Sequence, residues 1–394
     1  MKILPLISIS KTLTDSVFYK NIVQEFEQIQ MGSLEHQKCL YIDLRNVEFI
    51  SPSTLPKLCT FFMTLRNMGY ECHISLSHDS KMRSYLESLN FFNIVAQHRF
   101  AHLHESFLGG IKSGVNLSNG FFCVEKQTLI DKYTGKYAFD EALSEKDLLD
   151  FCIIFEVFGE PTTNTQRVDE VDEERVRRSP VLRTLSHLLS MKKMEHLTYD
   201  EKVNFDNDFF TKLKDMGKFF CELIQNSLWH GSDQCLFSVQ TGRYRRSNKV
   251  DDSEYFNRVD ISIADSGKGL YESLAKKDWE KLDKTTCSID LDKFLRLTDK
   301  SKQDLHSTIE ALLFRMGDPI RGLYDVLSDL SDKEKPIMSI HNRALRVKLS
   351  REHLHYTKNW HKHKQPHIDN ALPPNKREYF RNDYGVSIDI SFEI

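Results

Sequence analysis

The stretch CELIQNSLWHG, residues 221–231, constrains the fold of this chain more than any other. Glu222, Asn226 and His230 recur at every fourth position, so on an α-helix of about 3.6 residues per turn they form one slanted stripe. The residues around the stripe are mostly Phe, Leu and Ile, which predicts that the adjoining face of the helix packs in a hydrophobic core. A carboxylate, an amide and an imidazole in line beside a core face indicate a binding or catalytic site.

A second motif follows about forty residues further along the chain. The strand-like run RVDISIAD continues into Asp265-Ser266-Gly267-Lys268-Gly269, so a carboxylate and two alternating glycines stand at a strand end. Glycines in this position let the backbone come close to something flat or charged. The preceding strand pattern, CLFSVQTGRY, and the charged segment between the two predict a hairpin. The patterns PIMSIHNRALRVKL and YGVSIDISFEI predict the remaining strands.

Together these motifs resemble the Bergerat-fold (GHKL, histidine kinase-like) ATP-binding domain, over residues 184–394. The order matches the family: Glu-x-x-x-Asn on a helix, Asp-x-Gly-x-Gly after a strand, then Gly322-Leu323 at a helix start. ELIQNSLWHG is most similar to the anti-sigma-factor serine kinases. The resemblance implies a two-layer α/β sandwich that binds ATP with Mg²⁺.

The resemblance also implies roles for the motif residues. Asn226 offers a neutral oxygen ligand to Mg²⁺. Glu222, one turn earlier, would orient or deprotonate an attacking water or hydroxyl as the catalytic residue. Asp265 would accept the exocyclic amino proton of adenine.

Four further positions belong to the expected cofactor-binding set. Gly267 and Gly269 would let the backbone approach the base and sugar, and His230 would either contact phosphate or cap the helix end. Gly322 begins a helix whose N–H groups would meet the phosphates. The family has a second glycine two positions before Gly322, where this chain has Ile320, and this favours slow hydrolysis. Residues 271–308 match the expected lid, with Lys268 facing solvent.

The first part of the chain, residues 1–112, predicts a separate α/β domain. KCLYIDL and ECHISL have strand patterns, and the helix between them begins after Ser51 and Pro52, which suit a cap and a first helical position. YIDLRNVEFISPSTLPKLCTFF resembles the STAS domain of anti-sigma-factor antagonists. In that family a serine at this turn accepts phosphate, and Ser53 is the matching hydroxyl. The alternative is that Ser51 and Ser53 only cap the helix.

Residues 113–183 are expected to connect the two domains. LLDFCIIFEVFG predicts a buried strand, the polar and charged residues 159–180 predict a linker, and PVLRTLSHLLSM predicts a helix that leads into the second domain. The expected fold class is therefore α/β (α+β), a STAS-like domain followed by a Bergerat-fold sandwich.

Composition limits the cellular setting. A formal net charge of −3 gives no field that would recruit nucleic acid, and no apolar run approaches the roughly 20 residues that span a bilayer. The eight cysteines form no CxxC pair, which predicts reduced, mostly buried thiols in a cytoplasmic protein. The five histidines between 353 and 367 predict an exposed basic insertion rather than a metal site.

Two functions follow from these patterns. The first is a slow ATPase or serine kinase in signalling, with Glu222 as base. The second is a binding module in which ATP changes which protein docks, through the STAS-like domain or between two copies of the chain. A histidine kinase is not expected, because no phosphoacceptor-histidine helix pair precedes the ATP-binding motifs.

Overall fold

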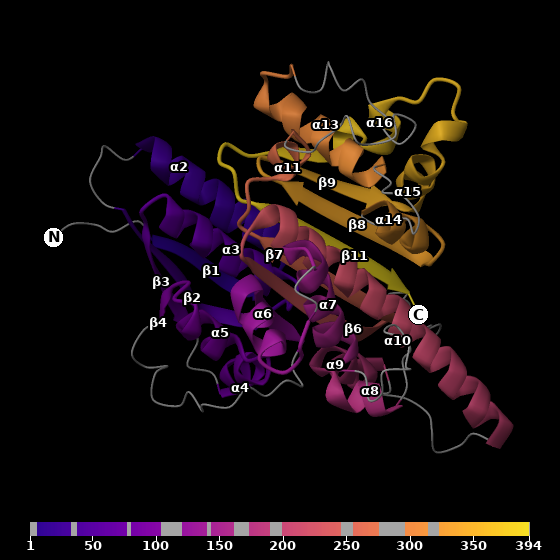
Figure 1. The fold of residues 1–394 in the computed structure, drawn as a ribbon. Helices are drawn as coiled ribbons and strands as arrows, with labels where there is room; N and C mark the ends of the chain where they lie inside the picture. The colour runs from indigo at the N-terminus through magenta and orange to yellow at the C-terminus, as the bar shows by residue number, and fades with distance from the viewer. Residues whose placement is uncertain are drawn as a thin grey trace.

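The computed structural model describes residues 6–32, 38–76, 80–103, 120–139, 143–160, 173–189, 199–245, 255–275, 296–313 and 323–393. Within these residues the chain is a mixed α/β protein with one parallel and one antiparallel sheet (Figure 1). The expected α/β class is confirmed.

The parallel sheet is formed by the first four strands, in the order β1-β2-β3-β4. Its strands are β1 (Leu6–Leu13), β2 (Cys39–Ile50), β3 (Glu71–Leu76) and β4 (His102–Leu103). Its helical segments are α1 (Asp15–Val17), η1 (Phe18–Val23), α2 (Gln24–Gly32), α3 (Thr54–Asn67), α4 (Ser80–Ser88) and α5 (Phe91–Gln97). The two predicted strands and the long helix between them are present.

The antiparallel sheet has the strand order β10-β9-β8-β11-β7-β6-β5. Its strands are β5 (Phe121–Glu125), β6 (Gln234–Arg245), β7 (Tyr255–Asp265), β8 (Glu334–Asn342), β9 (Leu345–Ser350), β10 (Arg377–Tyr379) and β11 (Val386–Glu393). The predicted pairing of β6 with β7 is confirmed and runs to Arg245 opposite Tyr255. The latest strand in the chain, β11, lies between β8 and β7.

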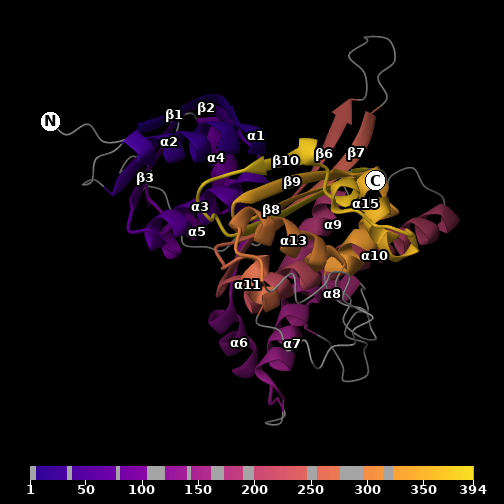
Figure 2. The ribbon, with the colours of Figure 1, turned by 90° about the horizontal axis from the view of Figure 1, so that it is seen from above.

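One face of this sheet is covered by helices that follow the parallel sheet in the chain (Figure 2). Strand residues with odd numbers in β7, such as Ile261 and Ile263, pack in the same cluster as Phe220 and Leu223 of α10. The helical segments are α6 (Lys126–Thr134), α7 (Glu145–Phe158), α8 (Glu173–Arg178), α9 (Pro180–Leu189), α10 (Tyr199–Asn226), η3 (Ser227–Gly231), α11 (Leu270–Ala275), α13 (Lys300–Leu313), α14 (Leu323–Ser331), α15 (Arg351–Lys358), η6 (Trp360–Lys362), α16 (Ile368–Ala371) and η7 (Pro374–Lys376).

The strand predicted for LLDFCIIFEVFG is wrong, because these residues lie in helix α7. Ser144 caps the helix by accepting a hydrogen bond from the Asp147 backbone, and Gly159 follows its last residue with a φ of 85°. A continuous apolar run does not distinguish a buried helix from a buried strand. Since β5 pairs with β6 and α7 packs on α10, the described parts of 120–160 belong with the antiparallel sheet and do not form a separate connection.

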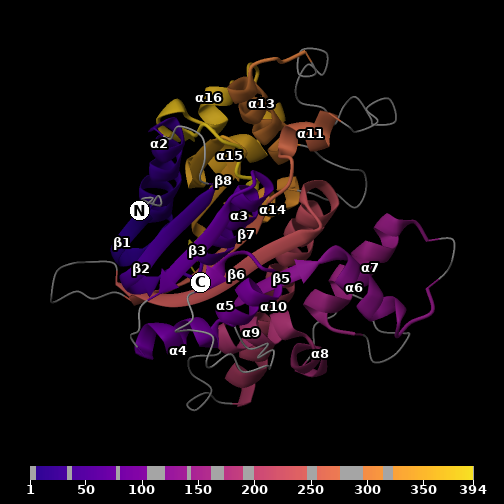
Figure 3. The ribbon, with the colours of Figure 1, turned by 90° about the vertical axis from the view of Figure 1, so that its left-hand side faces the viewer.

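Helix α3 lies between the two sheets. It contacts β3 of its own unit and also β6 and β7, and Figure 3 shows it in front of those two strands. Both of its sides are therefore covered, which explains why eleven of its fourteen residues are buried. A helix that is apolar nearly all round is expected in such a position. The two parts of the chain are joined by a packed interface and not only by a linker.

A buried lysine of α3 is held between carboxylates from both parts of the chain. The Nζ of Lys57 lies 2.6 Å from Asp15 Oδ2 and 2.7 Å from Asp389 Oδ1, and it donates to the Ser53 carbonyl at 3.1 Å. An ammonium group has three donors, so these partners satisfy it fully. Burial lowers the pKa of Lys57, but the charges of Asp15 and Asp389 outweigh burial and hold this pKa above its usual value.

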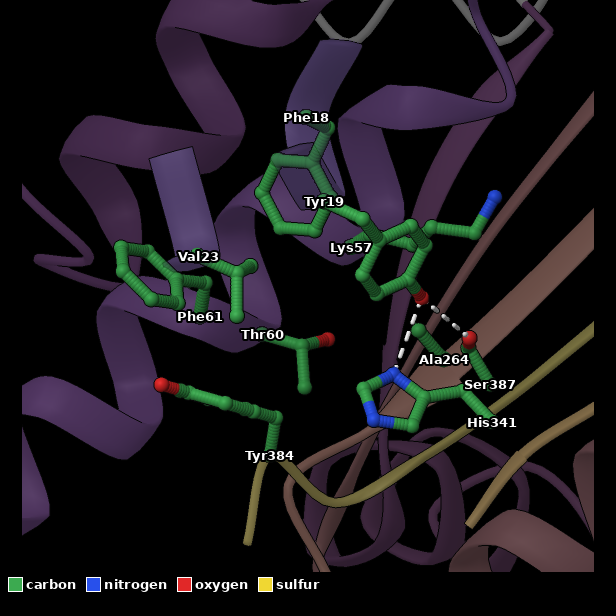
Figure 4. Close-up of a pocket in the computed structure, with 10 residues that line it drawn as sticks. All are labelled: Phe18, Tyr19, Val23, Lys57, Thr60, Phe61, Ala264, His341, Tyr384 and Ser387. Atoms are coloured by element: carbon green, nitrogen blue, oxygen red, sulfur yellow. Dashed lines mark hydrogen bonds between the residues drawn. The ribbon is translucent and has the colours of Figure 1, made fainter. Parts of the chain in front are cut away.

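Two further polar contacts cross the same interface. The Tyr19 hydroxyl is hydrogen-bonded to Nδ1 of His341 at 2.9 Å, beside a cavity of about 10 Å³ (Figure 4). Burial lowers the pKa of His341 to about 3, so this imidazole is neutral at physiological pH. Oε1 of Glu27 accepts hydrogen bonds from the backbone of Arg381 at 2.7 Å and of Asn382 at 3.1 Å. The interface thus gives partners to Tyr19, to Nδ1 of His341 and to Glu27, whereas Nε2 of His341 is buried without one.

The predicted cap of α3 differs from the structure. The helix begins at Thr54, and neither Ser51 nor Ser53 makes a side-chain cap in it. The two serine hydroxyls instead bond each other at 2.8 Å, and Ser53 donates to Asp15 Oδ1 at 3.3 Å. Pro52 lies in the turn before Thr54 and not at the predicted first helical position.

Replacing Lys57 with alanine should destabilise the protein strongly. The variant leaves Asp15 and Asp389 as uncompensated carboxylates at the interface, and breaking a buried pair in this way typically costs about 3–5 kcal/mol. Urea denaturation followed by tryptophan fluorescence measures the change in the free energy of unfolding. The control is Arg83→Ala, which breaks an exposed ion pair with Glu87 and should cost no more than about 0.5 kcal/mol. Equal effects of the two substitutions would contradict the role given to Lys57.

Candidate functional site

The predicted helix with a polar stripe is present as α10. Phe220, Leu223 and Ile224 are buried in the core, and Glu222 and Asn226 lie half-buried one turn apart beside them. The side-chain Nδ2 of Asn226 donates to the Glu222 carbonyl at 2.7 Å. Because Nδ2 is engaged there, Oδ1 is the atom of this amide that can serve a cation or a ligand.

The helix continues beyond Asn226 as the π-helical turn η3. His230 belongs to this turn, but its side chain lies outside the described residues. Trp229 of the same turn lies under the ammonium group of Lys126, 5.1 Å from the ring centroid. Wide helical turns of this kind occur frequently at functional sites.

Asp265 is the last residue of β7 and is 3% exposed. It follows Ile261 and Ile263 in the strand alternation and therefore faces the helical layer. Its Oδ1 accepts a hydrogen bond from the Gly267 backbone at 2.8 Å. Burial raises the pKa of Asp265 to about 7, although the bonds from Gly267 and from the Ser227 hydroxyl act in the opposite direction.

The side chains of Ser227 and Asp265 lie close together and join the two sequence motifs. Ser227 directly follows Asn226, so the buried carboxylate of Asp265 contacts the residue next to the amide. The turn η3 also packs against β7 and α11, which flank Asp265 in the chain. The structure thus brings Asn226 and Asp265 to one site, with Glu222 one helical turn away.

Gly269 has the Arg343 side chain packed against it. Its φ is +90°, and a Cβ at this position would lie 2.3 Å from Cδ of Arg343. The approach of a base or sugar to this glycine stays a prediction. Lys268, by contrast, is exposed as expected. Gly267 supplies the backbone N–H that holds Asp265.

Sequence patterns gave no sign of a buried network around Asn342, at the end of β8. Its Oδ1 accepts a hydrogen bond from the Leu270 backbone N–H at 3.0 Å. Its Nδ2 donates to the backbone carbonyl of Asp304 and to the hydroxyls of Ser307 and Thr308, all in α13 and each at 3.0 Å. One amide therefore ties the turn after Asp265 to α13. No spacing rule relates these positions, because they are 34 to 72 residues apart in the chain.

Asp304 is the acidic residue of this network. Its carboxylate is fully buried, lies 3.4 Å from Nε of Arg343 and accepts from the Ala344 backbone at 3.3 Å. Burial raises the pKa of Asp304 to about 6, with Arg343 acting in the opposite direction. Arg343 also pairs with Asp383 at 3.2 Å, so the network reaches the loop before β11.

A polar cavity of about 370 Å³ lies at the edge of this region. Ser266, of the turn after Asp265, lines it together with Lys300 and Arg381, and the C-terminal end of α3 forms the opposite wall. The cavity therefore sits where the second motif and the first part of the chain meet.

Ser53 is not part of this site. Lys57, one turn along α3, bonds Asp389, and Asp389 accepts from Ser262 of β7. Ser262 is an even-numbered residue of β7 and faces away from the helical layer, whereas Asp265 faces toward it. The antiparallel sheet therefore separates Ser53 from Asn226 and Asp265.

The remaining predicted positions are these. Gly322 and most of the expected lid lie outside the described residues. The histidines of 353–367 have structural contacts where they are described: His353 completes a capping box with Ser350, His363 stacks on Tyr356 at 4.1 Å, and His367 caps α16. None of these contacts brings the histidines to one centre. The described cysteines are all free thiols, and most are buried.

The chain matches no protein-family model, no curated protein and no solved structure. Among the described residues, no helix combines the length and the apolar character needed to cross a membrane. The arguments about function therefore rest on the geometry given above.

Asp265→Asn should make the pH dependence of stability weaker. A carboxyl whose pKa is near 3.8 unfolded and about 7 folded stabilises the fold when protonated, and this contribution is lost as pH rises through 7. The loss begins near the unfolded pKa, and the amide keeps an oxygen for Gly267 and carries no charge, so the variant should be close to wild type at about pH 4. It should be more stable at pH 8.5, by up to about 4 kcal/mol. Urea denaturation at both pH values measures the difference, and a difference independent of pH would contradict the assignment.

Proposed function

We propose that this chain is a regulatory protein that binds Mg²⁺-ATP where the end of α10 meets the end of β7. The single observation that carries the proposal is the packing of η3, which continues the Glu-x-x-x-Asn helix, against β7 and α11, which meet at the Asp-x-Gly turn. A buried carboxylate of raised pKa next to a half-buried amide and glutamate is typical of a ligand site. The proposal follows the resemblance to Bergerat-fold ATP-binding domains.

The residues present fit such a ligand. Oδ1 of Asn226 is a neutral oxygen of the kind that Mg²⁺ accepts, and Glu222 provides a carboxylate one turn away. Asp265, held by the Gly267 backbone, can accept a hydrogen bond from the exocyclic amino group of adenine. Bound ATP would supply a transferable phosphoryl group. The chain would hold the adenine base, the Asn226 amide and the Glu222 carboxylate in fixed relative positions.

The contacts around Asp265 support a switch that reaches the first part of the chain. Gly385 packs directly on Asp265, since a Cβ there would lie 2.1 Å from the Asp265 carbonyl oxygen. The loop that contains Gly385 continues back to Arg381 and Asn382, whose backbones bond Glu27 of α2. A ligand that moves the Asp265 turn would therefore act on the interface with the STAS-like part, and through it on a protein partner.

Slow ATP hydrolysis is the second candidate function. It is favoured by one observation, the position of Glu222 one helical turn from Asn226. Phosphotransfer to Ser53 within one chain has no such support, because the antiparallel sheet lies between Ser53 and the site. The Ser53 hydroxyl is also engaged with Ser51 and Asp15.

Isothermal titration with ATP and Mg²⁺ tests the binding proposal. Wild type should bind, and Asp265→Asn should bind about 10- to 100-fold more weakly, since a hydrogen bond to a charged group contributes about 1.5–3 kcal/mol. The matched control is Asp131→Asn, on the exposed surface of α6, which should bind as wild type does. Absence of binding by wild type, or equal binding by wild type and Asp265→Asn, would refute the proposal.

Phosphate release separates the two candidate functions. An ATPase should lose at least about tenfold in rate in Glu222→Ala, since general base catalysis typically contributes 10²–10⁴-fold. The exposed Glu145→Ala variant is the control and should keep the wild-type rate. A rate that Glu222→Ala does not change, in a protein that binds ATP, supports the switch and counts against Glu222 as a catalyst. Peptide mass spectrometry after incubation with γ-labelled ATP reports any label on Ser53.

A further inference from the structure

Four side chains with metal-binding atoms converge on one face of the parallel sheet, away from the proposed nucleotide site. Cys39 of β2 pairs with Glu71 of β3, and His73 of β3 pairs with His102 of β4. Residues two apart in a strand share a face, so Glu71 and His73 point to the same side. The parallel register therefore places Cys39, Glu71, His73 and His102 together.

The distances between these side chains are close to those of a metal centre. Nε2 of His73 lies 3.5 Å from Glu71 Oε1, and Nε2 of His102 lies 3.3 Å from the same oxygen. The ligand atoms of Cys39, Glu71 and His73 all lie within 4.8 Å of one another. In a tetrahedral zinc site with metal–ligand bonds of about 2.0–2.3 Å, neighbouring ligand atoms are about 3.3–3.6 Å apart. His102 adjoins this group of three through Glu71, and its side chain must rotate toward Cys39 before all four ligands reach one ion.

Ring stacking orients the two imidazoles. His73 stacks on Tyr41 at 4.4 Å with an interplanar angle of 8°, and on His102 at 5.0 Å with an angle of 25°. Both rings therefore lie nearly parallel, with Nε2 directed at the same carboxylate. Ligands that are held in this way lose less freedom when an ion binds.

The chemistry of the set selects the ion. One thiolate, two imidazoles and one carboxylate form a mixed donor set that suits Zn²⁺, whereas Mg²⁺ and Ca²⁺ require oxygen ligands. The side chains of Glu71 and His102 are 58% and 66% exposed, so an ion can reach the site from solvent. Four protein ligands leave no open position, which is the pattern of structural zinc sites.

We propose that Cys39, Glu71, His73 and His102 bind one Zn²⁺ ion that links β2, β3 and β4. Strand β4 has only two residues, both paired with β3, so few backbone hydrogen bonds hold this edge of the sheet. The ion would fix the edge through side chains. This site is independent of the nucleotide proposal, and its test does not involve ATP.

Titration of the full chain with Co²⁺, a spectroscopic substitute for Zn²⁺, tests the proposal. One equivalent should produce a thiolate-to-metal charge-transfer band in the near ultraviolet and the strong visible bands of tetrahedral Co²⁺, and Zn²⁺ should displace it. Cys39→Ser should remove the charge-transfer band. His102→Ala, at an exposed position that does not threaten the fold, should weaken binding by more than the roughly 10- to 100-fold typical of outer-shell changes.

Two matched controls locate the site. Cys123→Ser changes another half-buried thiol, on β5, and His355→Ala changes a histidine of the 353–367 segment. Both should bind Co²⁺ as wild type does. The proposal is overturned if wild type gives no thiolate band, if Cys39→Ser retains it, if His102→Ala binds like wild type, or if either control abolishes binding. Thermal unfolding adds a second readout, since Zn²⁺ should raise the Tm of wild type but not of Cys39→Ser.

Discussion

The burial of Lys57 between Asp15 and Asp389 is the interaction on which the arrangement of the molecule depends. A lysine is rarely buried unless it is paired, and here the two partners come from opposite parts of the chain. The pairing is satisfied only when α3 lies against the antiparallel sheet. Hydrophobic contacts alone would allow α3 several positions on that sheet. The two ion pairs of the Lys57 ammonium group form in only one of these positions. The two parts of the chain therefore act as one body around a shared helix.

The same sheet gives the molecule two different faces. Toward the helical layer its residues are mostly aliphatic, and Asp265 and Asn342 are polar positions at the strand ends on that side. Toward α3 the sheet carries Ser262, His341 and Asp389, each of which finds a partner in the first part of the chain or within the sheet. Strand alternation thus separates the surface that carries Asp265 and Asn342 from the surface that packs on α3, and only the thickness of one sheet lies between them.

Local sequence patterns are enough to predict the helix stripe and the glycine turn of the site. The contacts that bring distant segments together around them can be seen only in the structure. The stripe of Glu222 and Asn226 depends on helical periodicity alone, and the glycine turn after Asp265 depends on a strand end. The apolar run of residues 148–159 predicts a strand where the structure has helix α7, because such a run fits either structure. The burial of Lys57 could not be predicted from the sequence, since an isolated lysine is expected at the surface. Asn342 gave none either, because its partners come from distant segments and depend on the completed fold.

The position of β11 has a consequence for how the chain is made. Every other strand of the antiparallel sheet is synthesised before it, yet β11 lies at the centre, between β7 and β8. Until it emerges from the ribosome, no strand joins β7 to β8, so the edge of β7 and the edge of β8 that β11 later covers lack their final partner. Open edges of this kind pair readily with other chains. Chaperone binding during synthesis is therefore expected to concentrate in the interval between translation of β7 and translation of β11.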